Sequence, residues 1–146
     1  MKLENEFTVN TSIDEAWNAM RDLEKVTPCL PGAQLTAEVG DEYEGTMTVK
    51  MGPVTQKYNG TVKVEDADES AHRAVIRADG KDARGQGTAS ATITSTLSEQ
   101  DGGVHVLVET DMHLTGRAAQ FGRGMHKEVA TKIMGRFADC LEKELF

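Results

Sequence analysis

Alternation of apolar and polar residues dominates the middle of the chain. Between residues 43 and 51, every second position is apolar or glycine and the positions between are polar. This period of two is typical of a half-buried β-strand. Turn-forming residues such as Gly52-Pro53 separate such segments, so the sequence predicts consecutive antiparallel hairpins. The same period recurs in five further segments, at residues 3–10, 58–65, 74–78, 89–97 and 104–114.

The period becomes helical near the C-terminus, which predicts one long helix over the last part of the chain. An antiparallel sheet with one wet face must cover its other face, and this helix is the longest element available to do so. The sequence therefore predicts an α+β architecture in which a curved sheet grips the helix. The residues that recur every four positions are Phe121, Met125, Val129, Ile133, Phe137 and Leu141, and Ala118, Ala130, Met134 and Ala138 widen the stripe.

A short amphipathic helix is predicted after the first strand. Ser12 and Glu15 have the spacing of a capping box, in which the Ser12 hydroxyl accepts from the Glu15 amide and Glu15 reaches back. Ile13, Ala16 and Trp17 place apolar side chains on one face. The segment 27–32, with two prolines and a glycine, predicts a turn or a very short second helix.

Three glycines interrupt the predicted C-terminal helix. Gly122, Gly124 and Gly135 together cost roughly 2 kcal/mol relative to alanine if all lie inside it. One interpretation is that Gly122 and Gly124 remove side-chain volume beside Phe121 and Met125, which would open a passage or let a flat ring lie against the backbone. The other is that they permit a close contact between the helix and a strand.

Charge separates the chain into an acidic body and one basic segment. The 146 residues carry a formal net charge of −8, which argues against a generic nucleic-acid-binding protein. Residues 115–136 nevertheless contain five basic residues and one acidic residue. Arg117, Arg123 and Lys127 either meet anionic lipid headgroups or an acidic partner, or form an ordinary solvated polar face.

The length of the chain is that of one ordinary domain, and we predict a single domain over residues 1–146. The N-terminus has no apolar signal segment, and no run approaches the roughly 20 apolar residues of a membrane span. We therefore expect a cytoplasmic protein. Cys29 and Cys140 form neither a CxxC pair nor a disulfide framework, so two free thiols and no metal site are expected.

Catalytic motifs are not recognisable. The segments Gly85-Gln86-Gly87 and Gly122-Arg123-Gly124 lack the third glycine and the βαβ unit of a dinucleotide site. The four histidines have no metalloprotease or nucleophile motif around them. Most carboxylates lie at turns or on outward positions, where desolvation would not tune a pKa, and no catalytic residue is predicted. The polar residues predicted to face inward are Tyr43, Tyr58 and Thr110.

The predicted inner face is rich in methionine and small residues and poor in large aromatics. Such a lining either leaves a cavity or is filled by helix side chains, and the pattern alone leaves both alternatives open. If a cavity exists, its predicted lining is Met47, Met51, Met112, Leu114, Phe121, Gly122, Met125 and Val129.

Two segments resemble a known family. They are SIDEAWNAMRDLEKVTPCLPGAQ, at residues 12–34, and GRAAQFGRG, at residues 116–124. The chain resembles, essentially end to end, the family of the carbon monoxide dehydrogenase accessory protein CoxG, within the START/Bet v 1-like (SRPBCC) superfamily. The resemblance implies a helix-grip fold: a seven-stranded antiparallel sheet around the C-terminal helix, two short helices after the first strand, and a ligand cavity.

The resemblance also implies a partner, a molybdenum-containing CO dehydrogenase or related hydroxylase, and recruitment of that enzyme to the inner face of the cytoplasmic membrane. Many members continue into a hydrophobic C-terminal anchor, whereas this chain ends at Phe146. Either the anchor has been removed or this member works without one.

The leading hypothesis is a non-catalytic carrier of a respiratory quinone, menaquinone or ubiquinone, that links the dehydrogenase to membrane electron transport. The second is an adaptor with a filled interior that docks the dehydrogenase or the membrane through its basic residues. The third is an enzyme, because some relatives in the superfamily are cyclases or hydrolases. Few inward polar residues support it.

Overall fold

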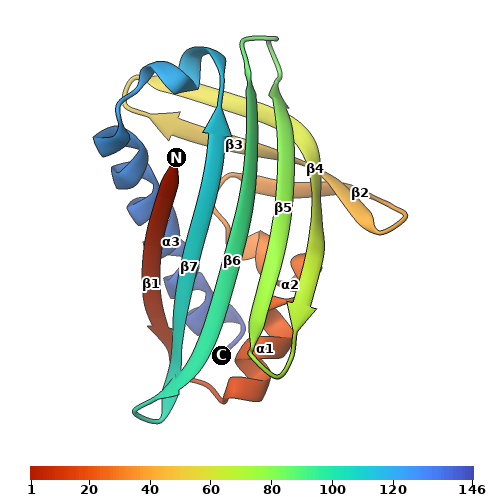
Figure 1. Cartoon of the computed structure of the whole chain (residues 1–146), viewed down its shortest axis with the longest axis vertical. Coiled ribbons are helices and arrows are strands. Elements are labelled where there is room, and N and C mark those ends of the chain that lie inside the picture. The colour runs from red at the N-terminus through yellow and green to blue at the C-terminus, as the bar shows by residue number, and fades with distance from the viewer.

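The computed structural model describes residues 1–146 as one sheet with helices on its concave side (Figure 1). The sheet has seven antiparallel strands in the order β1-β7-β6-β5-β4-β3-β2. The helix-grip architecture predicted above is confirmed. The elements are β1 (Lys2–Val9), α1 (Ile13–Met20), α2 (Leu23–Val26), η1 (Thr27–Cys29), β2 (Ala33–Val39), β3 (Glu42–Met51), β4 (Val54–Asp68), β5 (Arg73–Asp82), β6 (Thr88–Gln100), β7 (Gly103–Leu114), η2 (Gly116–Gln120) and α3 (Arg123–Glu144).

Six strands coincide with the alternating segments, and the seventh, β2, has no counterpart in the alternation. β2 pairs only with β3 and forms one edge of the sheet. Most of its residues are exposed, so its sequence carries no regular apolar face. The alternation reveals a strand only where one face is buried.

A row of glycines allows the sheet to curl. Gly45, Gly60 and Gly80 lie opposite one another on β3, β4 and β5. A Cβ atom built on Gly60 would lie 1.8 Å from the Asp79 carbonyl oxygen, and one on Gly45 would lie 2.7 Å from that of Gln34. Neighbouring backbone therefore occupies the space of a side chain here. In Figure 1, β3 and β4 bend across the end of the sheet near the start of α3.

The first helix begins as predicted. The Glu15 amide donates to the Ser12 hydroxyl oxygen over 3.2 Å. The Glu15 carboxylate accepts from the Thr11 hydroxyl over 2.6 Å, where the capping box predicts a bond to the Ser12 amide. Two short helices, α1 and α2, follow the first strand, and the segment after α2 forms the 3₁₀ turn η1.

The C-terminal helix begins later than the sequence suggests, and the cost assigned to Gly122 was wrong. Gly122 is the N-cap of α3, with extended backbone angles (φ −73°, ψ 165°), and glycine is tolerated well there. Cβ atoms at Gly122, Gly124 or Gly135 would meet nothing within 4 Å, so the close-contact interpretation is also wrong. The glycine that permits close approach is Gly116, whose φ is +76° and whose Cβ would lie 1.9 Å from the Gln86 carbonyl oxygen.

Buried apolar residues form two separate clusters along α3. The lower cluster contains 14 buried residues at the end near α1, among them Trp17, Val104, Phe137 and Leu141. The upper cluster surrounds η2 and has three buried members, with half-buried side chains packed against it. The buried members are Met51, Tyr58 and Ala118, and the half-buried side chains are Val49, Ala89, Leu114, Phe121, Met125 and Val129.

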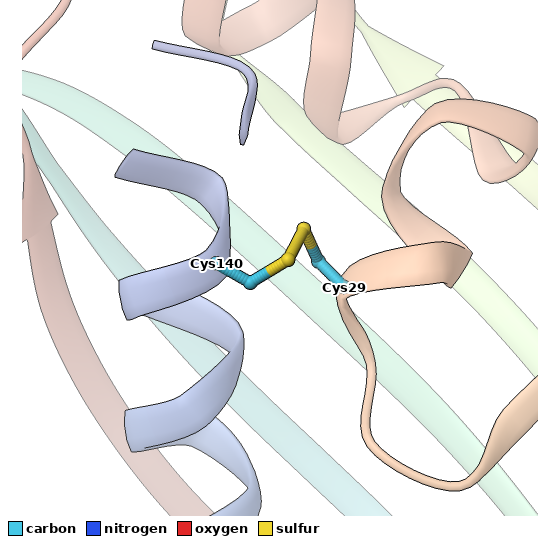
Figure 2. The surroundings of a disulfide bond; sticks show 2 residues. All are labelled: Cys29 and Cys140. Carbon is cyan, nitrogen blue, oxygen red and sulfur yellow. A yellow bond between two sulfur atoms is a disulfide. The ribbon is translucent and has the colours of Figure 1, made fainter. Parts of the chain in front are cut away.

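The expectation of two free thiols was wrong. Cys29 in η1 and Cys140 in α3 form a disulfide, with their Cα atoms 5.3 Å apart (Figure 2). The fold brings η1 against the last part of α3 although the two cysteines are 111 residues apart in sequence. That distance along the chain is why the pair could not be read from local spacing.

Candidate functional site

The inner face of the sheet is only half-buried between the two clusters. Val62, Ala78, Ala91 and Met112 lie opposite one another across β4, β5, β6 and β7. All four are half-buried, as is Ile133 on α3, and none belongs to either cluster. Side chains sandwiched between a sheet and a closely packed helix would be buried. We use the name inner groove for this half-buried part of the inner face, defined by these five residues.

The burial of inward-facing side chains decreases in the same direction along a single strand. On β7, Val104, Val106 and Val108 are buried in the lower cluster, whereas Thr110 and Met112 are half-buried. α3 comes closest to β1, η1 and β3 rather than to the strands in the centre of the sheet. The interior is therefore densely packed near α1, whereas the inner groove beyond it is only half-buried.

Most of the predicted lining residues lie around the inner groove or at its upper end. Met51, Leu114, Phe121, Met125 and Val129 are brought together in the upper cluster. Met47 faces inward opposite Tyr58 on β4, and Met112 belongs to the inner groove.

Gly122 is the exception among the predicted lining residues. It is exposed at the N-cap of α3, and a side chain there would extend into open space. The structure does not bring it together with the others.

Buried polar side chains also gather at the upper end. Tyr58 is 8% exposed and lies opposite Asp82, which is 6% exposed. Burial, followed by the nearby Asp82 carboxylate, raises the pKa of Tyr58 above its ordinary value. The Asp82 carboxylate in turn accepts from the backbone N–H of Gln86 over 2.9 Å.

Gln56 and His126 complete this polar set, and sequence reasoning missed both. Gln56 faces inward two residues before Tyr58 and is 3% exposed. His126 lies in the first turn of α3, is 7% exposed, and has its Nε2 atom 2.9 Å from the Ala118 carbonyl oxygen. The signals were present in the sequence: Gln56 continues the inward phase of Tyr58, and His126 lies four residues before Ala130 in the helical stripe.

The predicted basic residues lie near the same end. Arg117 is in η2, and Arg123 and Lys127 are in the first two turns of α3; all three are exposed. The Arg123 guanidinium donates to the Lys2 carbonyl oxygen over 2.8 Å, which holds it beside the start of β1. The upper end therefore combines an apolar interior with a positively charged rim.

Two surface hollows lie elsewhere. One of about 330 Å³ lies between α1, α2 and the C-terminus and includes Leu145 and Phe146. The other, of about 260 Å³, lies on the outer face of the sheet and has only polar and charged lining residues. Neither contains a predicted lining residue. No group of three or more potential metal-ligating side chains is present, and none of the helices has the length and apolar composition needed to cross a bilayer.

Comparisons with known proteins agree with this architecture. The family model for CoxG, a subunit of carbon monoxide dehydrogenase, matches residues 6–146. No curated protein sequence matches the chain.

Solved structures match over nearly the whole length. A conserved protein from Geobacillus kaustophilus is 19% identical with a TM-score of 0.84, covering 99% of this chain and 95% of that chain. The Zhui aromatase/cyclase from a Streptomyces strain is 12% identical with a TM-score of 0.67, covering 99% and 93%. Ara h 8.0201 is 17% identical with a TM-score of 0.66, covering 99% and 97%. At these identities the likeness concerns the fold, which is the helix-grip fold of Bet v 1-like proteins.

Proposed function

The chain belongs to the CoxG family of carbon monoxide dehydrogenase subunits, and on that premise we propose that it is a non-catalytic carrier of a respiratory quinone. The guest, menaquinone or ubiquinone, occupies the inner groove. The protein links a molybdenum CO dehydrogenase or related hydroxylase to the quinone pool of the membrane. It works in the cytoplasm at the inner membrane face.

The observation that carries this proposal is the accessible apolar surface between the two clusters. Ala78, Ala91 and Met112 lie side by side on the inner face of the sheet and are only half-buried. Met47, Met112 and Met125 add flexible, polarisable side chains that adapt to an irregular apolar guest. A long hydrocarbon fits such a surface better than a compact polar substrate does.

The energetics require no large set of polar ligands. Burying one five-carbon prenyl unit contributes roughly 4 kcal/mol before the costs of binding, at about 0.8 kcal/mol per carbon. A tail of several units is therefore held by apolar contact alone. The same reasoning supports a binding role rather than a catalytic one.

A block at the upper end tests the carrier role. Phe121 is half-buried against the upper cluster, so Phe121→Trp adds volume where a guest would contact it. We expect Phe121→Trp to lower the quinone that co-purifies with the protein several-fold, measured by solvent extraction and chromatography. Gly122→Leu should have the smaller effect because its side chain would lie in open space.

The matched control is Val39→Trp, which adds an aromatic ring on the exposed edge strand β2, where Val39 is 56% exposed. This variant should retain quinone like the wild type. Undiminished quinone in Phe121→Trp would contradict the proposed binding site.

The charged rim supports membrane docking, and this part of the proposal also fits an adaptor with no guest. Arg117 and Lys127 are exposed and take part in no ion pair. Each basic residue at an anionic surface contributes about 1 kcal/mol.

Charge reversal tests the docking role. The Arg117→Glu/Lys127→Glu variant should bind phosphatidylglycerol-containing vesicles at least tenfold more weakly at low salt in a sedimentation assay. Lys57→Glu/Lys81→Glu, two exposed positions on β4 and β5, is the control. Equal losses for both variants would show that overall charge, not the rim, governs binding.

A further inference from the structure

Two buried side chains at the upper end each have one polar atom without a hydrogen-bond partner. These atoms are the amide Nε2 of Gln56 and the ring Nδ1 of His126. The side chains are 3% and 7% exposed. Leaving such groups unpaired is unfavourable, and each instance in a folded protein needs an explanation. The third such atom, Trp17 Nε1, lies in the densely packed lower cluster.

Gln56 and His126 are each linked to the upper cluster, one through a strand neighbour and the other through a hydrogen bond. Gln56 on β4 lies opposite Val49 on β3, and Val49 packs against the upper cluster. His126 on α3 is bonded to Ala118, a buried member of that cluster. One polar group is thus supplied by the sheet and the other by the helix.

The bond to Ala118 fixes the chemistry of His126. A carbonyl oxygen only accepts, so His126 Nε2 carries the proton that it donates to Ala118. In the neutral ring, Nδ1 is then a hydrogen-bond acceptor. The free Nε2 of Gln56 is a donor. The upper cluster is therefore flanked by one unused donor and one unused acceptor.

We propose that Gln56 and His126 form a polar subsite for the oxygen-bearing head of the guest. Gln56 donates to a carbonyl oxygen of the head, and His126 accepts from a hydroxyl group when the head carries one. The head lies at the upper end beside the basic rim, and the tail runs along the inner groove towards the lower cluster. This inference rests on the proposed function and adds the orientation of the guest.

The neighbouring groups are consistent with a neutral head. The Tyr58 phenol is protonated at neutral pH, as a tyrosine ordinarily is, and burial and Asp82 raise its pKa further. The carboxylate of Asp82 already accepts from the backbone N–H of Gln86. A carbonyl or hydroxyl group fits these surroundings, whereas an anionic head would be repelled by Asp82.

The test separates recognition of the head from recognition of the tail. The probes are decylubiquinone, which carries ring oxygens, and decylbenzene, which has a ring and chain without them. The variant is Gln56→Met, which keeps the shape of the side chain and removes the donor. Gln100→Met, at an exposed position on β6, is the control.

We expect the wild type to bind decylubiquinone more tightly than decylbenzene. Gln56→Met should weaken decylubiquinone about three- to tenfold, the effect of one net hydrogen bond, and leave decylbenzene unchanged. Equal affinity of the wild type for both probes, unaltered in Gln56→Met, would overturn the subsite while the carrier function stands. Failure of the wild type to bind either probe would instead count against the carrier function.

Two further measurements exclude a purely structural role. Because Gln56 Nε2 is unpaired, Gln56→Met should leave the melting temperature of the ligand-free protein unchanged or raise it; a marked fall would overturn the assignment. With the imidazole neutral, ¹⁵N NMR should show the proton of His126 on Nε2 and a shift of the Nδ1 resonance on adding decylubiquinol. An unshifted resonance with the probe bound would remove His126 from the subsite.

Discussion

The two ends of α3 differ in how deeply their apolar side chains are buried. Near its C-terminus, Phe137 and Leu141 pack into a cluster of 14 buried residues that is tied to η1 by a disulfide. Near its N-terminus, Met125 and Val129 are half-buried against only three buried residues, with Gln56 and His126 close by. One helix thus belongs to a dry core at one end and to an accessible, partly polar lining at the other.

The difference indicates that one end of the molecule stabilises the fold and the other is suited to binding a guest. The densely packed lower cluster stabilises the fold through burial of apolar surface. The upper end therefore does not need to be densely packed for the protein to fold. Half-buried methionines and unpaired polar atoms contribute little to stability and are expected where a guest completes the interior. Substitutions at the two ends should therefore affect different properties.

The largest difference in stability is expected between alanine substitutions at the two ends of α3. Leu141→Ala removes a side chain that is 0% exposed and should lower the free energy of unfolding by about 2–5 kcal/mol. Met125→Ala removes a half-buried side chain and should cost about 1 kcal/mol or less. Urea unfolding followed by Trp17 fluorescence measures both.

Quinone binding should show the reverse order. Met125→Ala should retain less quinone, whereas folded Leu141→Ala should retain as much as the wild type. Equal destabilisation by the two substitutions would remove the distinction between the ends.

A somewhat smaller effect is expected from reducing the disulfide. Cys29 and Cys140 close a long loop, and opening it should lower the free energy of unfolding by about 2–4 kcal/mol. Unfolding curves with and without a reducing agent give the difference. The Cys29→Ser/Cys140→Ser variant should not respond to the reducing agent. Two titratable thiols in the native protein without reductant would contradict the bond.

The smallest effect concerns the ionisation of Tyr58. Its raised pKa keeps the phenol neutral in the folded protein above pH 10, where a free tyrosine ionises. The stability that this contributes is present below pH 10 and is lost as the pH rises through the folded-state pKa.

The chain has two tyrosines, so in Tyr43→Phe the absorbance at about 295 nm reports on Tyr58. The midpoint should lie above the ordinary value, and adding Asp82→Asn should move it down. A midpoint at the ordinary value would show that Tyr58 is not desolvated.

Periodicity predicted the elements that have one buried face. Six strands, the capped helix after Ser12 and the C-terminal helix all follow from apolar spacing. The edge strand β2 did not, because most of its residues are exposed on both faces. The start of α3 was placed too early because Phe121 continues the apolar stripe, although Gly122 caps the helix.

The polar part of the candidate site was harder to predict. Gln56 lies upstream of the apolar alternation that defined its strand, and His126 lies among apolar residues of the stripe without any motif. A polar residue in an inward phase was the available signal. Its lack of a partner depends on the whole fold, as does the pairing of Cys29 with Cys140.

The most direct test of the central claim is native mass spectrometry of the protein purified gently from its host, followed by lipid extraction. The account predicts an isoprenoid quinone in near-stoichiometric amount, lost on denaturation. A folded protein with no extractable quinone would contradict the carrier function and leave only a docking role.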